Sequence, residues 1–461
     1  MKYRSTRGGV AGLSFKDAVI MGLADDGGLL VPHELPDVSD ELDRWQELDY
    51  AGLACEVMSR FIDDLPKDEL KSLIDASYAT FDHPLVTPLV NVGDLHILEL
   101  FHGPTLAFKD VALQFLGNVF EYILTERGAF VNILGATSGD TGSAAIAGVR
   151  GKANINIYVM FPEGKTSPIQ ERQMTTILDD NVHNIAVEGS FDDCQRIMKE
   201  IFSDLAFKEH YSLAAVNSVN WARVLAQIVY YFSAWYQLGR PQTFDVAVPT
   251  GNFGNIFAGF CAREMGLPIR HLVLATNEND ILCRFFNEGV YQRGDVQYTF
   301  SPAMDIQVSS NFERYLYYKL GRSEEKVKAF MNRFLSTGQE TLHFNTERLD
   351  AAFLAGAVSN AETLDTIRSV NAETDYLVDP HTAVGITVGR RFRTDDVPLL
   401  CLATAHPAKF EEAIREALPD IDVSHPTLTK LAGLPVRKTL LKADVDTVKR
   451  FIEIGGRLQG P

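Results

Sequence analysis

A lysine after a Gly-Pro turn is the first residue of this sequence whose surroundings suggest chemistry. Lys109 stands in FHGPTLAFKD, between Phe108 and Asp110, where a loop gives way to an expected helix. Most lysines lie on solvated surfaces, but this one has apolar neighbours. Burial and a helix N-terminus both disfavour an ammonium ion and lower the pKa of a lysine. Schiff-base chemistry requires a neutral amine, so Lys109 is a candidate nucleophile.

The segment ILGATSGDTGSAA, residues 133–145, reads as a strand and a helix joined by a glycine- and hydroxyl-rich turn. Glycines let main-chain N–H groups approach a ligand closely, and a helix N-terminus favours an anion. The hydroxyls of Thr137, Ser138 and Thr141 add hydrogen-bond donors. An N-capped turn without a ligand uses the same residue types, so the spacing alone leaves both interpretations open.

The segment VAVPTGNFGNIFAG, residues 246–259, is a second turn between a strand and a helix. Its central residues can direct several N–H groups at one point, which suits a phosphate dianion. These residues are Gly251, Asn252, Phe253, Gly254 and Asn255. The run is neither a P-loop nor a G-x-G-x-x-G fingerprint, so it does not indicate a nucleotide. A tight turn without a ligand is the alternative.

Two further segments offer polar groups beside these turns. In CLATAHPAKF, Thr404 follows an apolar strand, and its hydroxyl either enters a cleft or caps the next helix. His406 is interpreted as a turn residue rather than a base. In NSVNWARVLAQ, Asn220 and Arg223 are three residues apart and share a helix face. An amide and a guanidinium together can bind an oxyanion, although a surface arginine is the alternative.

Taken together, these positions fit one ligand. A neutral lysine can capture an aldehyde, the glycine-asparagine turn can hold a phosphate, and a threonine hydroxyl can meet a ring nitrogen. Pyridoxal 5′-phosphate carries all three groups. It is therefore the cofactor that the residues predict.

Alternating apolar strands and amphipathic helices must position these loops. From about residue 95 onward, segments such as INIYVMFP and TFDVAVPT read as strands and are followed by helical patterns. This alternation predicts an α/β fold with parallel sheets and helices on both faces, whose ligands bind at the C-terminal ends of the strands. Three domains are expected: a mostly helical domain with few strands at 1–92, a large domain of 93–112 and 236–461, and a small α/β domain at 113–235. The final stretch, PVRKTLLKADVDTVKRFIEIGGRLQGP, is expected to form a peripheral helix.

Composition limits the class of protein. The 461 residues are 46% hydrophobic and 23% charged, which is typical of a soluble globular protein. The formal net charge of −18 disfavours nucleic acid as a partner, and no apolar run reaches the roughly 18 residues of a membrane span. The five cysteines form no CxxC pair, so neither a disulfide framework nor a metal site is expected. With no recognisable signal or transit peptide, the sequence predicts a cytoplasmic protein.

The motifs resemble those of the threonine synthase family, in its bacterial and fungal form with a longer N-terminal region. The similar segments are HGPTLAFKD, ATSGDTG, GKTSPIQ, NSVNWARVLAQ, PTGNFGN and ATAHPAKF, with YRSTRG and GLADDGGLLVP near the start. They occur in the family's order from residue 3 to about residue 415. The resemblance implies a fold-type-II pyridoxal-phosphate enzyme, similar to the tryptophan synthase β chain. The implied reaction is that of a lyase, in which O-phosphohomoserine and water give threonine and phosphate.

The resemblance also implies roles for residues around the cofactor. Lys109 corresponds to the catalytic lysine that forms the Schiff base and then acts as general base. Thr404 corresponds to the partner of the pyridine nitrogen, and residues 251–255 correspond to the loop that holds the cofactor phosphate. Asp140 is counted with the cofactor-binding residues, at a position where many relatives of the fold have Asn.

On the substrate side, the family's TSGDTG loop receives the substrate carboxylate, which gives that role to Thr137, Ser138 and Thr141. The substrate's phosphate is assigned to the pair on one helix face and, as weaker candidates, to two residues of GKTSP. These four residues are Asn220, Arg223, Lys165 and Ser167.

Two alternatives to the synthase stay open. A phospho-lyase or dehydratase of the same fold would use the same lysine, loop and hydroxyl and release 2-oxobutanoate. A non-catalytic protein that only binds pyridoxal phosphate is the other, although the intact Lys109 argues against it. The expected partner is a small-molecule substrate, with no nucleic acid and no membrane. Monomer and homodimer are both compatible with the sequence.

Overall fold

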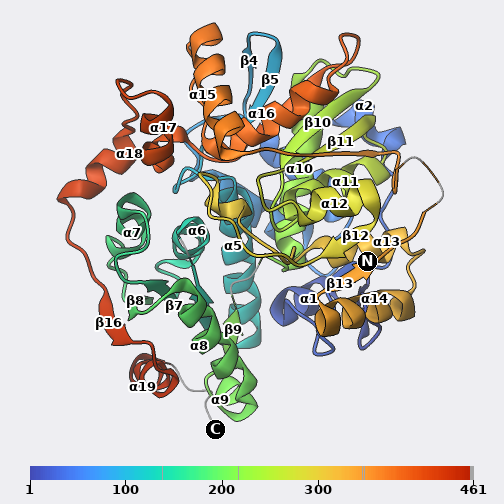
Figure 1. The fold of residues 1–461 in the computed structure, drawn as a ribbon. Helices are drawn as coiled ribbons and strands as arrows, with labels where there is room; N and C mark the ends of the chain where they lie inside the picture. The colour runs from blue at the N-terminus through green and yellow to red at the C-terminus, as the bar shows by residue number, and fades with distance from the viewer. Residues whose placement is uncertain (138, 216–217, 345, 347, 457–461) are drawn as a thin grey trace. The chain divides into compact units, whose positions relative to one another are not determined.

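The computed structural model describes residues 1–137, 139–215, 218–344, 346 and 348–456. The chain forms two compact units, both drawn in Figure 1. Unit 1 consists of Met1–Gly103 and Ser218–Val423. Unit 2 consists of Pro104–Asn217 and Ser424–Pro461. The chain therefore passes from one unit to the other three times.

This division differs from the three expected domains. Helix α10 (Trp221–Gln237) lies in unit 1, although the sequence assigned all of it up to residue 235 to the small domain. Residues 424–461, which the sequence assigned to the large domain, lie in unit 2. Residues 1–92 belong to unit 1. The three-domain boundaries remain a prediction.

Helices are the main regular elements of the first 92 residues, as expected, but these residues also contain a small sheet. The helices are α1 (Phe15–Met21), α2 (Leu42–Trp45), α3 (Tyr50–Ser59) and α4 (Lys67–Tyr78), with a 3-10 turn at Ser39–Glu41. Three short antiparallel strands lie in the order β2-β1-β3: β1 (Tyr3–Ser5), β2 (Ala11–Leu13) and β3 (Leu30–Pro32). Strands of three residues are too short for alternation to reveal them.

A six-stranded sheet forms the centre of unit 1, in the order β14-β11-β10-β15-β5-β4. Its strands are β4 (Leu89–Val92), β5 (Leu95–Glu99), β10 (Phe244–Pro249), β11 (Ile269–Thr276), β14 (Phe353–Ala357) and β15 (Leu399–Ala403). All neighbours are parallel except β4, which pairs antiparallel with β5 at the edge. Since β10 and β15 are adjacent and parallel, the loops that follow them leave the sheet at the same edge.

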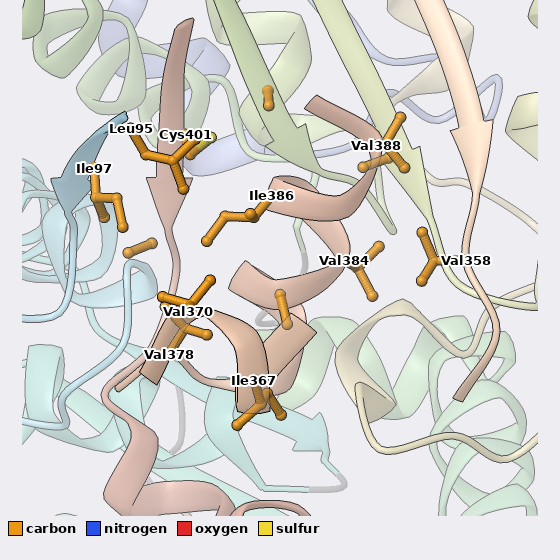
Figure 2. Close-up of a cluster of buried hydrophobic side chains, with 14 of the residues drawn as sticks. Leu95, Ile97, Val358, Ile367, Val370, Val378, Val384, Ile386, Val388 and Cys401 are labelled. Carbon is orange, nitrogen blue, oxygen red and sulfur yellow. The ribbon is translucent and has the colours of Figure 1, made fainter. Parts of the chain in front are cut away.

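Helices pack their apolar faces against this sheet, and the buried side chains between them form the core. Figure 2 shows Leu95, Ile97 and Cys401 of the sheet gathered with Ile386 of α16 and Val370 of α15, and all are buried. Each fully buried side chain of this size contributes about 1.5–3 kcal/mol to folding. The helices of this part are α10, α11 (Gly254–Glu264), α15 (Asn360–Thr374), α16 (Pro380–Phe392) and α17 (Glu411–Ala417), with a 3-10 turn at Pro407–Phe410.

An aromatic-rich part of unit 1 lies between β11 and β14 in the sequence. It contains α12 (Ile281–Glu288), α13 (Phe312–Lys319), α14 (Glu324–Thr337), a 3-10 turn at Pro302–Met304 and the antiparallel pair β12 (Val290–Gln292) and β13 (Gln339–Thr341). Ser323 caps α14 by accepting a hydrogen bond from the main-chain N–H of Lys326. The sequence therefore supplies its own N-terminal cap for α14.

Unit 2 is built on a five-stranded parallel sheet in the order β16-β8-β7-β6-β9. The strands are β6 (Val131–Ala136), β7 (Ile155–Pro162), β8 (Val182–Glu188), β9 (Leu213–Ala215) and β16 (Thr439–Lys442). The helices are α5 (Lys109–Arg127), α6 (Asp140–Val149), α7 (Pro168–Thr175), α8 (Phe191–Ser203), α9 (Leu205–His210), α18 (Pro426–Thr429) and α19 (Val445–Gly455), with a 3-10 turn at Lys430–Gly433. The expectation of only a peripheral helix at the C-terminal end was incomplete, because β16 pairs with β8 before α19 begins.

Two glycines bring α5 and α6 of unit 2 into close contact. A Cβ on Gly117 would lie 2.0 Å from the main-chain oxygen of Gly148, and one on Gly148 would lie 2.4 Å from the oxygen of Leu113. Both distances are shorter than any real carbon–oxygen contact, so only glycine fits. The first residues of the two helices, Lys109 and Asp140, are thereby held near each other.

The fold class predicted from the sequence, α/β with parallel sheets, is confirmed. Within the described ranges, no helix combines the length and the apolar character needed to cross a membrane.

Candidate active site

The lysine singled out from the sequence is buried in unit 2. Lys109 is the first residue of α5 and is 8% exposed. Its Nζ lies 3.5 Å from Oδ2 of Asp140 and 5.3 Å from the centre of the Phe108 ring. The apolar neighbours in the sequence thus correctly predicted an unsolvated amine, whereas the carboxylate beside it was not predicted.

The turn before Lys109 is fixed by the next residue, Asp110. The carboxylate of Asp110 accepts hydrogen bonds from the N–H of Thr105 at 2.8 Å and from its hydroxyl at 2.7 Å. Gln173 of α7 donates its amide to the main-chain oxygen of Thr105 at 3.0 Å. A carboxylate in the first turn also complements the dipole of α5. The aspartate after the lysine is therefore what holds the start of α5 in place.

Asp140 opens α6 and uses its two oxygens differently. Oδ1 accepts a hydrogen bond from Nε2 of Gln170 at 2.8 Å, and Oδ2 faces Lys109. A Cβ on Gly139 would lie 2.2 Å from Oε1 of Gln170, so glycine is required where the loop passes that side chain. A buried amine and a buried carboxylate therefore lie side by side at ion-pair distance.

The hydroxyl of Thr137 closes the turn between β6 and α6. It accepts hydrogen bonds from the N–H groups of Gly139 and Gly142, both at 3.0 Å. Thr141 is half-buried in the first turn of α6. Ser138 lies outside the described residues. The substrate-binding roles expected for these three hydroxyls remain predictions. The hydroxyl of Thr137 already accepts two hydrogen bonds within the turn, and these occupy its acceptor positions.

In the GKTSP segment, the most buried hydroxyl belongs to a residue that the sequence did not single out. Lys165 is exposed and Ser167 is half-buried just before α7. Thr166 between them is 7% exposed, and its Oγ1 has no hydrogen-bond partner among the described residues. The roles predicted for Lys165 and Ser167 remain predictions, and Thr166 joins them as a candidate.

In unit 1, the turn after β10 has a left-handed residue that is not glycine. Phe253 has φ of 62°, a conformation that costs free energy for a residue with a side chain. Its ring stacks on Phe286 and Phe353 and meets Phe312 edge-on. This packing holds the turn so that α11 begins at Gly254.

The turn and the start of α11 form a cradle suited to an anion. A Cβ on Gly251 would lie 2.7 Å from the main-chain oxygen of Ala303, so only glycine allows this close approach. Gly254 begins α11, and the first turn of the helix contains no acidic residue. The first N–H groups of a helix have no partner within it and attract negative charge.

Asn255, in the first turn of α11, has an unused donor. Its Oδ1 accepts hydrogen bonds from the hydroxyls of Tyr230 at 2.5 Å and Tyr231 at 3.1 Å. Its Nδ2 is buried and has no partner among the described residues. A buried donor left unpaired costs about 1–3 kcal/mol, so this geometry calls for an acceptor. The tyrosines were missed, although Tyr230 follows Arg223 by seven residues and so lies on the same face of α10.

Thr404 follows β15 and is 6% exposed. Its N–H donates to Oγ1 of Thr382 at 3.3 Å, and Thr382 in turn donates its hydroxyl to the buried carboxylate of Asp379. The main chain at Thr404 is therefore fixed by buried hydrogen bonds through Thr382 and Asp379, and this fixes the position of the Thr404 hydroxyl. His406 accepts a hydrogen bond from the N–H of Ala408 at 3.2 Å, which confirms its interpretation as a turn residue.

Asn220 and Arg223 lie at the start of α10. Asn220 caps the helix by accepting from the N–H of Ala222 at 3.1 Å, and it donates to the main-chain oxygen of Val19 at 2.8 Å. Arg223 is 5% exposed, so the alternative of a surface arginine is wrong. Burial lowers the pKa of Arg223 to about 10, and its charge is retained at neutral pH. A buried cation at the positive end of a helix is suited to an anionic ligand.

Comparison with known proteins decides the family. The models described as "Threonine synthase N terminus", "Pyridoxal-phosphate dependent enzyme" and "Threonine synthase, C-terminal" match residues 2–78, 81–398 and 382–452. The threonine synthase of Schizosaccharomyces pombe is 47% identical, over 91% of this chain and 89% of its own. That of Pseudomonas aeruginosa is 45% identical over 100% of both chains. The chain belongs to the threonine synthase family.

The threonine synthase likeness extends to solved structures. The pyridoxal-phosphate-bound threonine synthase of Brucella melitensis is 43% identical, with a TM-score of 0.96 over 99% of this chain and 100% of its own. The predicted fold-type-II architecture and the resemblance drawn from the motifs are confirmed. This member of the threonine synthase family is a pyridoxal-phosphate-dependent lyase that acts on a small molecule.

Taken residue by residue, each unit offers groups whose chemistry suits a part of the cofactor. The unpaired Nδ2 of Asn255, at the N-terminus of α11, suits a phosphate group. The buried amine of Lys109 suits an aldehyde, and the hydroxyl of Thr404 suits a ring nitrogen. The assignment of each residue to its part of the cofactor remains a prediction.

Proposed function

We propose that this protein converts O-phosphohomoserine and water to L-threonine and phosphate by β,γ-elimination followed by addition of water. The observation that carries the proposal is the extent of the family likeness. One threonine synthase model matches residues 2–78, before the region of the general cofactor-binding family at 81–398, and another matches residues 382–452, most of which lie beyond it. A fold that hosts many activities would not by itself select one of them.

The cofactor is proposed to be held at three points. Lys109 binds its aldehyde carbon, residues 251–255 bind its phosphate, and Thr404 receives its ring nitrogen. When bound, pyridoxal phosphate supplies an electron sink for charge that develops at the substrate's Cα. A hydroxyl leaves the ring nitrogen less electron-withdrawing than a carboxylate partner would.

Proton movement is assigned to Lys109. With pyridoxal phosphate and substrate bound, the Nζ of Lys109 would take the proton from Cα of the substrate and later return a proton. Asp140, 3.5 Å away, stabilises the charge that Nζ then carries. Because the hydrogen bond from Gln170 fixes the carboxylate, this stabilisation needs no rearrangement.

Recognition of the substrate's phosphate is assigned to Arg223. A protein with a net charge of −18 does not attract an anion as a whole, so the attraction must be local. Arg223 supplies a buried positive charge at a helix N-terminus, where the helix dipole adds to it. Asn220, Lys165 and Ser167 are the further candidates for the same phosphate.

The proposal is tested by incubating the holoenzyme with O-phosphohomoserine and measuring released phosphate and amino-acid product in parallel. Equal amounts of phosphate and threonine are expected. Release of 2-oxobutanoate in place of threonine would assign the phospho-lyase reaction instead. No phosphate release from a protein that has bound pyridoxal phosphate would contradict both.

We also propose that the protein works in the cytoplasm. All five cysteines are free thiols, and Cys55, Cys194, Cys261 and Cys401 are buried. Such a set is stable in a reducing compartment. Fractionation of the source cells, followed by an assay for threonine formation, tests this assignment.

A further inference from the structure

A short segment of unit 1 contacts both places where phosphate binding is proposed. This segment, residues 309–314, ends the loop after the 3-10 turn at Pro302–Met304 and opens α13. We call residues 251–255 the cofactor loop and residues 218–223 the α10 start. None of residues 309–314 was singled out from the sequence.

Residues 309–314 hold the cofactor loop by donating hydrogen bonds to main-chain oxygens of that loop. Asn311 donates both its N–H and its Nδ2 to the oxygen of Asn252, each at 3.0 Å. Ser309 donates its hydroxyl to the oxygen of Gly251 at 2.9 Å. In a trans peptide, the C=O and N–H groups point in opposite directions. Since the two carbonyl groups face residues 309–311, the N–H groups of the same peptides point away from this segment.

The same segment also holds the α10 start. Nδ2 of Asn311 donates to the oxygen of Ser218 at 3.1 Å, and Arg314 donates to the oxygen of Val219. Arg314 also donates to Oδ1 of Asn311 at 2.5 Å, which fixes the orientation of that amide. Asn311 and Arg314 are both fully buried.

These contacts link the cofactor loop to two places on α10. At one end, Asn311 bonds the α10 start and the cofactor loop with a single amide group. Further along the same helix, Tyr230 and Tyr231 bond Asn255 at the other end of the cofactor loop. If the cofactor loop shifts, the α10 start must therefore shift with it. Arg223, which lies in the α10 start, shifts as well.

We propose that Asn311 is a positioning residue that keeps the cofactor loop and the α10 start in register, so that binding of the cofactor's phosphate and binding of the substrate's phosphate depend on each other. This proposal rests on the proposed function for the second of these ligands. Asn311 touches neither ligand in this account. It acts through Asn252 on one side and Ser218 on the other.

The informative substitution is Asn311→Asp. Aspartate keeps the main-chain bond to Asn252 and the oxygen that Arg314 bonds, but it replaces the Nδ2 donor with an oxygen that faces two carbonyl groups. Dissociation constants for pyridoxal phosphate and the KM for O-phosphohomoserine at saturating cofactor are both expected to rise about tenfold, as for the loss of about 1.4 kcal/mol of hydrogen bonding.

Two companion variants separate positioning from stability. Ser309→Ala removes a contact to the cofactor loop alone, so it is expected to weaken cofactor binding and leave the substrate KM at saturating cofactor unchanged. Tyr236→Phe is the matched control, because it removes one hydrogen bond, to the oxygen of Leu42, near the far end of α10. It is expected to change neither binding constant.

Two readouts do not depend on turnover. Cofactor binding is titrated by the visible absorbance of pyridoxal phosphate. With the cofactor loop filled, the rise in Tm of the holoenzyme on addition of inorganic phosphate reports the second phosphate site. In Asn311→Asp both responses are expected to shift to about tenfold higher ligand concentrations.

The proposal is overturned if Asn311→Asp lowers Tm but leaves both responses unchanged, or if only one of them changes. If Asn311→Asp does not fold, Asn311→Ala, which removes the Nδ2 donor without placing an oxygen against the two carbonyl groups, takes its place and must show the same double effect. A wild-type protein that makes no threonine would sink the proposed function, while the two binding readouts would still decide the role of Asn311.

Discussion

At the scale of single residues, the most informative feature is a buried guanidinium at the start of a helix. Arg223 is buried in the first turn of α10, where the helix dipole is also positive. The two positive charges together favour binding of an anion. The anion that we propose is the substrate's phosphate.

Replacing Arg223 with Ala tests this role. The KM for O-phosphohomoserine is expected to rise about 30-fold, as for the loss of about 2 kcal/mol from a charge-assisted contact. Inhibition by unphosphorylated homoserine, measured in the same assay, is expected to change less than threefold. An equal loss for both compounds would contradict a phosphate-binding role.

Replacing Lys109 with Ala is expected to abolish turnover, because no other group would then hold the cofactor's aldehyde and take the Cα proton. The visible absorbance band of the bound cofactor, and its bleaching by borohydride, are expected to disappear as well. Lys199→Ala, an exposed lysine on α8 of the same unit, is the control and keeps both. Normal turnover by the Lys109→Ala variant would show the assignment to be wrong.

The residues of the site were predictable to different degrees. The burial of Lys109 could be predicted from its apolar neighbours. The existence of the cofactor loop could be predicted from its glycines and asparagines. The tyrosines that orient Asn255 could have been found by helical spacing from Arg223. The contacts of Asn311 could not, because they join segments 59 and 93 residues apart and no local pattern encodes them.

At the scale of elements, the close packing of α5 on α6 sets the relation between Lys109 and Asp140. Gly148→Ala is expected to force the helices apart, because the added Cβ would lie 2.4 Å from the oxygen of Leu113. We expect the free energy of unfolding to fall by about 1–3 kcal/mol and kcat to fall with it. Urea denaturation and steady-state kinetics measure both quantities.

Gly433→Ala is the control for this packing effect, because nothing lies within 4 Å of a Cβ at that position of unit 2. Its stability and kcat should match those of the wild type. If Gly148→Ala also matched the wild type, the two helices could not be in the contact described.

The segment that leaves β5 is anchored by His102, which predicts a dependence of stability on pH. Burial acts to lower the pKa of His102, but its hydrogen bonds to Glu99 and Asp82, each 2.8 Å, outweigh burial and raise the pKa. The stabilisation is therefore complete below the ordinary pKa of about 6.5 and is lost as pH rises through the raised value.

The difference in unfolding free energy between wild type and His102→Gln should thus shrink between about pH 6 and pH 9. Urea unfolding at several pH values measures it. A difference that stays constant over this range would show that the charge of His102 contributes nothing.

Long elements were predictable from the sequence, and short ones were not. The strand β7 is long enough to be recognised as an apolar run, and the helix α8 is long enough for its helical periodicity to show. The strands β1, β2 and β3 have three residues each, and β16 alternates only between half-buried and exposed positions. Pairing with distant strands, rather than local pattern, makes these segments strands.

At the scale of the whole molecule, cofactor binding should contribute measurably to stability. A ligand that binds only the folded protein stabilises it by about 2.7 kcal/mol at a hundredfold excess over its Kd. Removal of pyridoxal phosphate is therefore expected to lower Tm, and its return to restore the original value. Calorimetry of the apo and holo proteins tests this, and identical Tm values would contradict binding to the folded state.

The return of the chain to unit 2 after Val423 has a consequence for biosynthesis. The edge strand β16 is translated more than 220 residues after β9, the previous strand of its sheet. While the ribosome is still adding unit 1, β8 has an open edge to which a strand of another nascent chain can pair. The sheet of unit 2 is therefore completed only after all of unit 1 has been translated, and chaperones that shield exposed strand edges would have the whole of that interval in which to act.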